Sequence, residues 1–155
     1  MEQKPELSLT LLMPGQVLGP WRDVVEKAIA VGLVPRTLAE CGKQVAAQLQ
    51  RGRYRAYVLG ARLPNVSEEQ AGVALVIAYR SIDEATGEYI FYVWSLLGVD
   101  HLGEEDWAVA FRLLREEARK LNCKRINAVS DNPRVIQLVE QLGGSAEKRL
   151  LTWEI

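Results

Sequence analysis

The chain has 155 residues, 48% of them hydrophobic and 25% charged, which is enough apolar material to bury one sizeable core. Its formal net charge of -1 excludes a strong overall attraction to nucleic acid or to an anionic membrane. No apolar run approaches the ~20 residues of a membrane span, and the first residues do not have the pattern of a secretory signal. We therefore expect a single domain over residues 1–155, located in the cytoplasm.

The cysteines and the histidine predict no metal site. Cys41 and Cys123 lie far apart without a CxxC pair, and His101 is the single histidine of the chain. Neither a zinc site nor a disulfide framework is indicated, and we assign no metal-binding residue.

The first third of the chain predicts a strand followed by two helices. Residues 7–14 alternate apolar and polar before becoming continuously apolar, which favours a short strand closed by Pro14 and Gly15. Apolar residues at helical spacing predict a helix from Trp21 that stops at Gly32. Thr37 and Glu40 have the spacing of a capping box and predict a second helix over 37–50.

The middle of the chain predicts three neighbouring strands, over 54–63, 71–80 and 88–99, separated by polar turns. Short links between consecutive strands favour an antiparallel meander. The runs VALVIA and IFYVW are apolar on both faces of their strands, so helices are expected to cover both sides of the sheet.

The last third predicts a helix, a strand, a helix and a final strand. The helix over 104–122 has an apolar stripe that consists of Trp107, Ala110, Phe111, Leu114, Ala118 and Leu121. A strand over 125–130 precedes a helix capped by Asp131 or Asn132, with Pro133 at its first position and Gly143-Gly144 at its end. Its inward positions are expected to be Val135, Ile136, Leu138, Val139 and Leu142. Residues 148–155 (KRLLTWEI) predict the last strand.

This order of elements resembles the GNAT N-acetyltransferase superfamily over nearly the whole chain. The segment INAVSDNPRVIQLVEQLGG is similar to the strand, asparagine and helix of the form LYeklGF that the family has at this place. The positions that match are Asn132, Leu138, Glu140, Leu142 and Gly143. The resemblance implies an α/β (α+β) fold with a GNAT-like mixed, mostly antiparallel sheet, flanked by helices on both faces. It also implies that the sheet splays where the strands over 88–99 and 125–130 part.

The resemblance places the pyrophosphate of acetyl-CoA at the start of the helix over 104–122, in a loop of the form Q/R-x-x-G-x-G/A. Glycines allow the backbone to approach phosphate, and free amides favour an anion. Here EDWAVA, over 105–110, lies on the motif. Glu105 replaces the basic or amide residue and Ala108 the middle glycine, and only Ala110 fits. Each of the first-turn acids would repel a phosphate about 5 Å away by roughly 3 kcal/mol.

The family's catalytic tyrosine, which protonates the departing thiolate, corresponds to Val139, and valine cannot exchange a proton. Glu88, Asp100 and His101 are candidates for a general base, but each is also explained as a residue at a strand end or turn. We therefore assign no catalytic residue and no cofactor-binding residue, and we expect no cofactor.

These departures predict a non-catalytic GNAT-fold binding or structural protein. Small degenerate proteins of this kind occur as virion or accessory components of tailed phages, so the resemblance implies that setting, with the virion as a second location. The expected partners are other protein chains, in a homo-oligomer or a larger assembly, with the last strand free to pair at a sheet edge. The alternative is an acetyl-CoA-dependent N-acetyltransferase with an atypical cofactor loop.

A third function, nucleic-acid binding, depends on the segment RGRYR. Arg51, Arg53 and Arg55 alternate beside Tyr54 and Tyr57, so a strand would place the three arginines on one face, towards phosphates. Basic residues at a strand edge more often prevent aggregation, so we expect no nucleic-acid partner.

Overall fold

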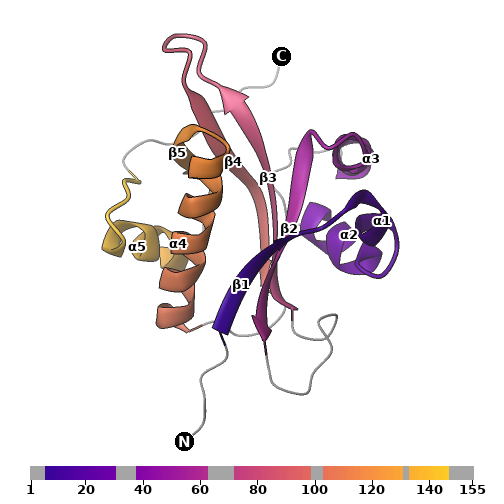
Figure 1. Cartoon of the computed structure of the whole chain (residues 1–155), viewed down its shortest axis with the longest axis horizontal. Helices are drawn as coiled ribbons and strands as arrows, with labels where there is room; N and C mark the ends of the chain where they lie inside the picture. The colour runs from indigo at the N-terminus through magenta and orange to yellow at the C-terminus, as the bar shows by residue number, and fades with distance from the viewer. Residues whose placement is uncertain (1–5, 31–37, 63–71, 99–102, 131–132, 147–155) are drawn as a thin grey trace, which may run out of the picture.

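In the computed structural model, the described residues are 6–30, 38–62, 72–98, 103–130 and 133–146 (Figure 1). Five strands form one sheet in the order of the sequence: β1 (Glu6–Leu11), β2 (Tyr54–Arg62), β3 (Gly72–Ile82), β4 (Tyr89–Gly98) and β5 (Cys123–Ala128). The first three pairings are antiparallel, and β4 pairs with β5 in parallel. The predicted α/β fold with a mixed, mostly antiparallel sheet is confirmed.

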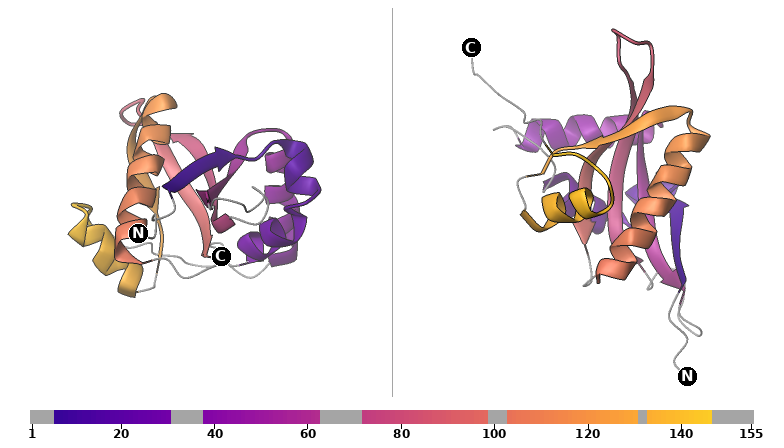
Figure 2. Two further views of the ribbon diagram at one scale, coloured as in Figure 1. Left: turned by 60° about the horizontal axis from the view of Figure 1, so that its bottom comes forward. Right: turned by 90° about the vertical axis from the view of Figure 1, so that its left-hand side faces the viewer.

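Helices cover both faces of this sheet (Figures 1 and 2). One face carries α1 (Pro14–Leu18), α2 (Arg22–Ala30) and α3 (Leu38–Gln50), whereas α4 (Glu104–Lys120) lies on the other, with α5 (Pro133–Gln141) on the same side as α4. Among the described residues, no helix is long and apolar enough to cross a membrane.

The core has two halves because the central strands bury side chains on both faces. On the α1–α3 face, Leu75 and Ile77 of β3 pack with Val25 and Ala28 of α2. On the α4 face, a second cluster is built around the fully buried ring of Phe91. Residues 74–78 of β3 are buried without a break, as the apolar run VALVIA predicts.

The apolar stripe of α4 is placed as predicted, with one correction. Ala110, Leu114 and Ala118 are buried, and Trp107 packs against the core from the first part of the helix. Phe111 is only half-buried. Ala110 and Phe111, three and four positions after Trp107, lie on neighbouring rows of the helix surface. The sheet contacts the row that contains Ala110.

Two further predictions are corrected. The inward positions of α5 are only partly buried, no residue of α5 is fully buried, and Leu142, just beyond its end, is 39% exposed. Pro14 and Gly15, predicted to close the first strand, instead begin the short helix α1, because proline is favourable at the first position of a helix. The predicted last strand, 148–155, lies outside the described residues.

Candidate functional site

The parallel strands β4 and β5 separate before β4 ends. Their pairing stops at Val93 and Ala128, whereas β4 remains paired with β3 as far as Gly98. Among the described residues, the stretch of β4 after Val93 therefore has no strand partner on its β5 side. Backbone groups that lack a strand partner are available to an extended ligand or to another chain.

A β-bulge lies where this free edge begins. Val93 is opposite Ala78 and Ser95 is opposite Ile77, so Trp94 is the extra residue of β4. A bulge leaves its extra residue out of the ladder and bends the strand, and bulges are common beside active sites. Ser95 is 4% exposed and its hydroxyl donates to the carbonyl of Ala28 at 2.5 Å, which fastens this part of β4 to α2.

The start of α4 lies after this free edge, and acidic groups of the chain surround it. The backbone N–H of Gly103, the N-cap residue, donates to Oδ2 of Asp106 at 3.3 Å. Glu104 and Glu105 are exposed in the same turn, and Ala108 is exposed one turn later. Carboxylates stabilise a helix start, but they repel a phosphate at the same place. Among the described residues, the first turn of α4 therefore presents carboxylates, which disfavour an anion at that place.

The other positions considered for catalysis lie apart or outside the described residues. Val139 is half-buried in α5, and a Cβ added at Gly144 would clash with its Cγ1, so this side chain packs against the end of its own helix. Glu88 lies in the β3–β4 hairpin and forms an ion pair with Arg125 at 3.5 Å. Asp100, His101 and Asn132 are not described.

The segment RGRYR does not form the predicted strand face. Arg51 and Arg53 precede β2 in the turn that ends α3, where Gly52 has a φ of 71°. Their backbone N–H groups donate to the carbonyls of Ala47 and Gln48. Glycine at a helix end favours this left-handed turn. The alternating arginines predicted a strand at this place instead.

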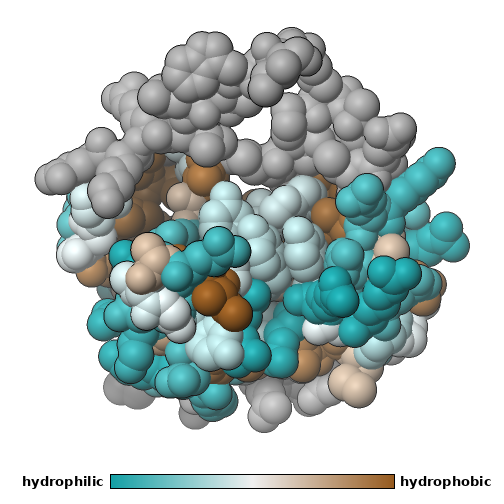
Figure 3. Space-filling model, turned by 90° about the horizontal axis from the view of Figure 1, so that it is seen from above, coloured by the Kyte–Doolittle hydropathy of each residue, from teal (hydrophilic) through white to brown (hydrophobic). Residues whose placement is uncertain are grey.

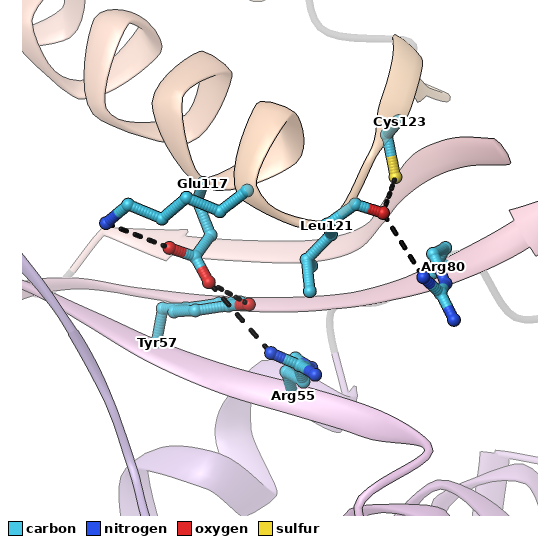
Figure 4. Close-up of polar contacts among 7 residues, drawn as sticks. Arg55, Tyr57, Arg80, Glu117, Leu121 and Cys123 are labelled. Carbon is cyan, nitrogen blue, oxygen red and sulfur yellow. Dashed lines mark hydrogen bonds and ion pairs between the residues drawn. The ribbon is translucent and has the colours of Figure 1, made fainter.

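Arg55 is the only one of the three arginines that lies in β2, and it belongs to a polar cluster on the α4 side (Figure 4). Its Nη1 lies 4.0 Å from Oε1 of Glu117. Nearby, Arg80 of β3 donates to the carbonyl of Leu121 at 3.2 Å, and its guanidinium lies 4.2 Å from the centre of the Tyr89 ring. These contacts hold the end of α4 against the sheet.

An aromatic row on the opposite face was missed by the sequence analysis. Tyr54 of β2 stacks on Tyr79 of β3 with ring centres 4.7 Å apart and planes 8° from parallel. Tyr79 in turn meets Tyr92 of β4 at 5.1 Å. Each tyrosine was visible in a predicted strand, but the register that aligns them depends on turn lengths and on the bulge at Trp94.

Comparison with known proteins identifies the fold. No family model and no curated relative matches the sequence. A solved structure of a probable acetyltransferase matches with a TM-score of 0.65 and 12% identity, over 97% of this chain and 96% of that chain. A ribosomal-protein-alanine N-acetyltransferase from Brucella melitensis biovar Abortus 2308 matches with 0.64 and 18%, over 97% and 99%. An aminoglycoside N-acetyltransferase in complex with CoA matches with 0.62 and 10%, over 100% and 98%. The chain has the GNAT acetyltransferase fold.

Proposed function

We propose that this GNAT-fold protein is an N-acetyltransferase that takes its acetyl group from acetyl-CoA. The observation that carries the proposal is the free edge of β4 after Val93, next to the bulge at Trp94. An opening between two parallel strands, with unpaired backbone on one side, suits the extended arm of acetyl-CoA that carries the thioester. This arm would pair with the strand edge as an added strand does. This is the alternative function expected from the sequence, and the shared fold favours it.

The residues of this chain supply binding and position at the opening. When bound, the thioester of acetyl-CoA supplies an activated acetyl group. The β4 edge would orient the arm that carries it, and the bond between Ser95 and Ala28 keeps the bulge in place. Val139 offers no proton at the matching family position, so we assign no general acid.

The acidic start of α4 sets an expectation for affinity. Asp106 already accepts the Gly103 N–H, and Glu104 and Glu105 add negative charge to the same turn. These groups oppose the phosphates of the cofactor, so we expect acetyl-CoA to bind weakly and chiefly through its arm.

The same acidic turn favours a second candidate, a GNAT-fold protein that binds other chains without catalysis. Its carboxylates satisfy the helix start without a phosphate, and Val139 removes the family's proton donor. Such a protein would act through its surface, in a homo-oligomer or a larger assembly. A virion or accessory role in a phage stays a prediction for this candidate.

Calorimetry with acetyl-CoA and CoA, followed by an acetylation assay, separates the two candidates. The acetyltransferase predicts saturable binding of acetyl-CoA at micromolar to millimolar concentrations, and release of free thiol when amine acceptors are added. Binding without thiol release across peptide, polyamine and small amine acceptors would favour a non-catalytic protein that retains the cofactor. If neither ligand binds at millimolar concentration, the acetyltransferase proposal is wrong.

A further inference from the structure

The outer edge of β1 is open. β1 begins the sheet and, among the described residues, pairs with β2 alone. The right view of Figure 2 shows it at the margin of the sheet. Natural edge strands usually carry charges, proline or a bulge, because unpaired backbone groups bind other strands. Residues 7–11 contain neither a charge nor a proline, and their register with β2 runs without a shift. The edge of β1 is therefore suited to pairing with a further strand.

The pairing with β2 shows which backbone groups face this edge. The N–H of Leu12 donates to the carbonyl of Ala56 at 2.8 Å, so Leu12 directs its backbone groups towards β2. In an antiparallel pair, residues alternate between those that bond to the partner strand and those that face away from it. Counting back from Leu12, three residues of β1 direct both N–H and C=O away from β2: Leu7, Leu9 and Leu11.

These three leucines also form an apolar row. Alternation along the strand places their side chains on the face that α4 covers, where Leu7 and Leu9 pack against the buried side chains of Leu59 and Ala110. Leu7 and Leu9 nevertheless stay partly exposed, and Leu11 is 40% exposed. A strand added beside β1 would bring its own side chains against this row, and apolar pairs across neighbouring strands stabilise a sheet.

The segment that follows this edge carries no charge. Residues 7–21 contain no Asp, Glu, Lys, Arg or His, and two further large apolar side chains are exposed there, Met13 at 62% and Leu18 at 45%. The cores of protein interfaces are poor in charged residues and rich in Met. By contrast, the end of the molecule that carries the β3–β4 hairpin is largely hydrophilic over its described residues (Figures 1 and 3). A charge-free surface can meet its own copy without repulsion between like charges.

We propose that the chain forms a two-fold symmetric dimer in which β1 pairs antiparallel with β1 of a second copy. With the axis at Leu9, each Leu9 exchanges N–H···O=C bonds with Leu9 of the partner subunit, and each Leu7 does so with Leu11 of the partner subunit. A strand that pairs with its own copy forms every contact twice. A second copy is the best-matched occupant because it offers the same outward backbone groups and the same charge-free surface. The dimer does not depend on acetyl transfer, since the β4 opening lies on the β5 side of the sheet.

Amide hydrogen exchange followed by NMR tests this pairing in the unmodified protein. Between about 20 µM and about 1 mM protein, exchange at the N–H groups of Leu7, Leu9 and Leu11 should slow by about threefold or more, because the dimer population rises by mass action. The N–H groups of Ser8 and Thr10 point towards β2, so their exchange should change little. Light scattering over the same range should give a dimer with a Kd below about 100 µM.

Leu11→Lys separates this edge from the rest of the surface. Because Leu11 is 40% exposed, the folded monomer should tolerate a lysine there, whereas the dimer would carry two added charges beside the paired strands. The Kd of the dimer should rise by about tenfold or more. Leu142→Lys is the matched control, because Leu142 is 39% exposed and lies just beyond α5. It should leave the Kd unchanged, and the melting temperatures of both variants show that they fold.

Four results would overturn the proposal. A monomer at every concentration would leave the edge to a different protein. If the outward N–H groups exchange as slowly as those of Ser8 and Thr10 even in dilute protein, another segment of this chain pairs with β1. A dimer that forms without slowing exchange at the outward N–H groups uses another surface. An effect of Leu142→Lys on the Kd equal to or greater than that of Leu11→Lys would also place the interface elsewhere.

Discussion

The hydroxyl of Tyr57 donates a hydrogen bond to Oε1 of Glu117 at 3.1 Å, and this bond joins β2 to α4 (Figure 4). Tyr57 is only 1% exposed, whereas the Glu117 side chain is 19% exposed. Burial, and then the neighbouring carboxylate of Glu117, raise the pKa of the Tyr57 phenol. The bond therefore stays intact at pH values at which an ordinary tyrosine loses its proton.

Tyr57→Phe should lower the free energy of unfolding by about 1 kcal/mol at neutral pH, since one hydrogen bond is lost. It should also weaken the pH dependence of stability at alkaline pH. Above about pH 10 the unfolded chain releases the Tyr57 proton while the folded protein keeps it, so the stability of the parent falls as pH rises. Some slope should remain, because burial raises the pKa of Tyr79 as well. Urea denaturation at a series of pH values measures both effects, and equal slopes for parent and variant would contradict the assignment.

Leu114→Ala should cost about 2 to 5 kcal/mol, because Leu114 is 7% exposed in the core under α4. Phe111→Ala should cost less, about 1 to 2 kcal/mol, because the Phe111 ring is partly in water. Denaturant unfolding of the two variants checks the rotation of α4 on the sheet. If Phe111→Ala lowers the free energy of unfolding more than Leu114→Ala does, α4 is rotated so that Phe111 faces the sheet.

Ser95→Ala should cost about 1 kcal/mol, because the carbonyl of Ala28 near the end of α2 loses the hydroxyl that bonds to it. If the bulge positions the acetyl-CoA arm, the same variant should weaken acetyl-CoA binding. Ser81→Ala, in the neighbouring strand β3, serves as the control for both measurements. Weaker binding by the control to the same degree would show that general loss of stability causes the effect.

Replacing Glu105 with arginine and both Asp106 and Ala108 with glycine should strengthen acetyl-CoA binding by about ten- to a hundredfold. The changes remove repulsion, release the Gly103 N–H and allow the backbone closer to phosphate. Acetyl transfer should not increase in proportion, because Val139 is unchanged. Melting temperature is measured alongside, since glycine weakens a helix.

Glu116→Arg is the charge control for the triple variant, because it lies on an exposed position of α4 several turns away. It should leave acetyl-CoA binding nearly unchanged. If the triple variant folds but binds acetyl-CoA no better than the parent, the acidic turn does not face the cofactor.

The elements were predictable where the pattern of apolar residues is long. The apolar stripe of α4 predicted a helix, and the continuous apolar run of β3 predicted a buried strand. Both elements appear within a few residues of their predicted bounds. Short polar segments were different. Arg51 and Arg53 alternate as in a strand, but the positive φ of Gly52 turns them into a helix end.

The candidate site was less predictable than the fold, because it depends on relations between distant segments. The acidic start of α4 was visible in the sequence, since its charges are consecutive. The row of Tyr54, Tyr79 and Tyr92 was not, because it needs the register of three strands. Pairing between strands is fixed by tertiary packing as well as by local pattern.

The parallel position of β5 has a consequence for the order in which the sheet forms. β2, β3 and β4 follow one another directly and pair with their neighbours in the chain, whereas β5 reaches β4 only after the whole of α4 has crossed the sheet. Closing that longer loop costs chain entropy before any pairing is gained, so β5 should join after β2, β3 and β4 have paired. In native-state hydrogen exchange, the amides of β3 should therefore exchange more slowly than those of β5.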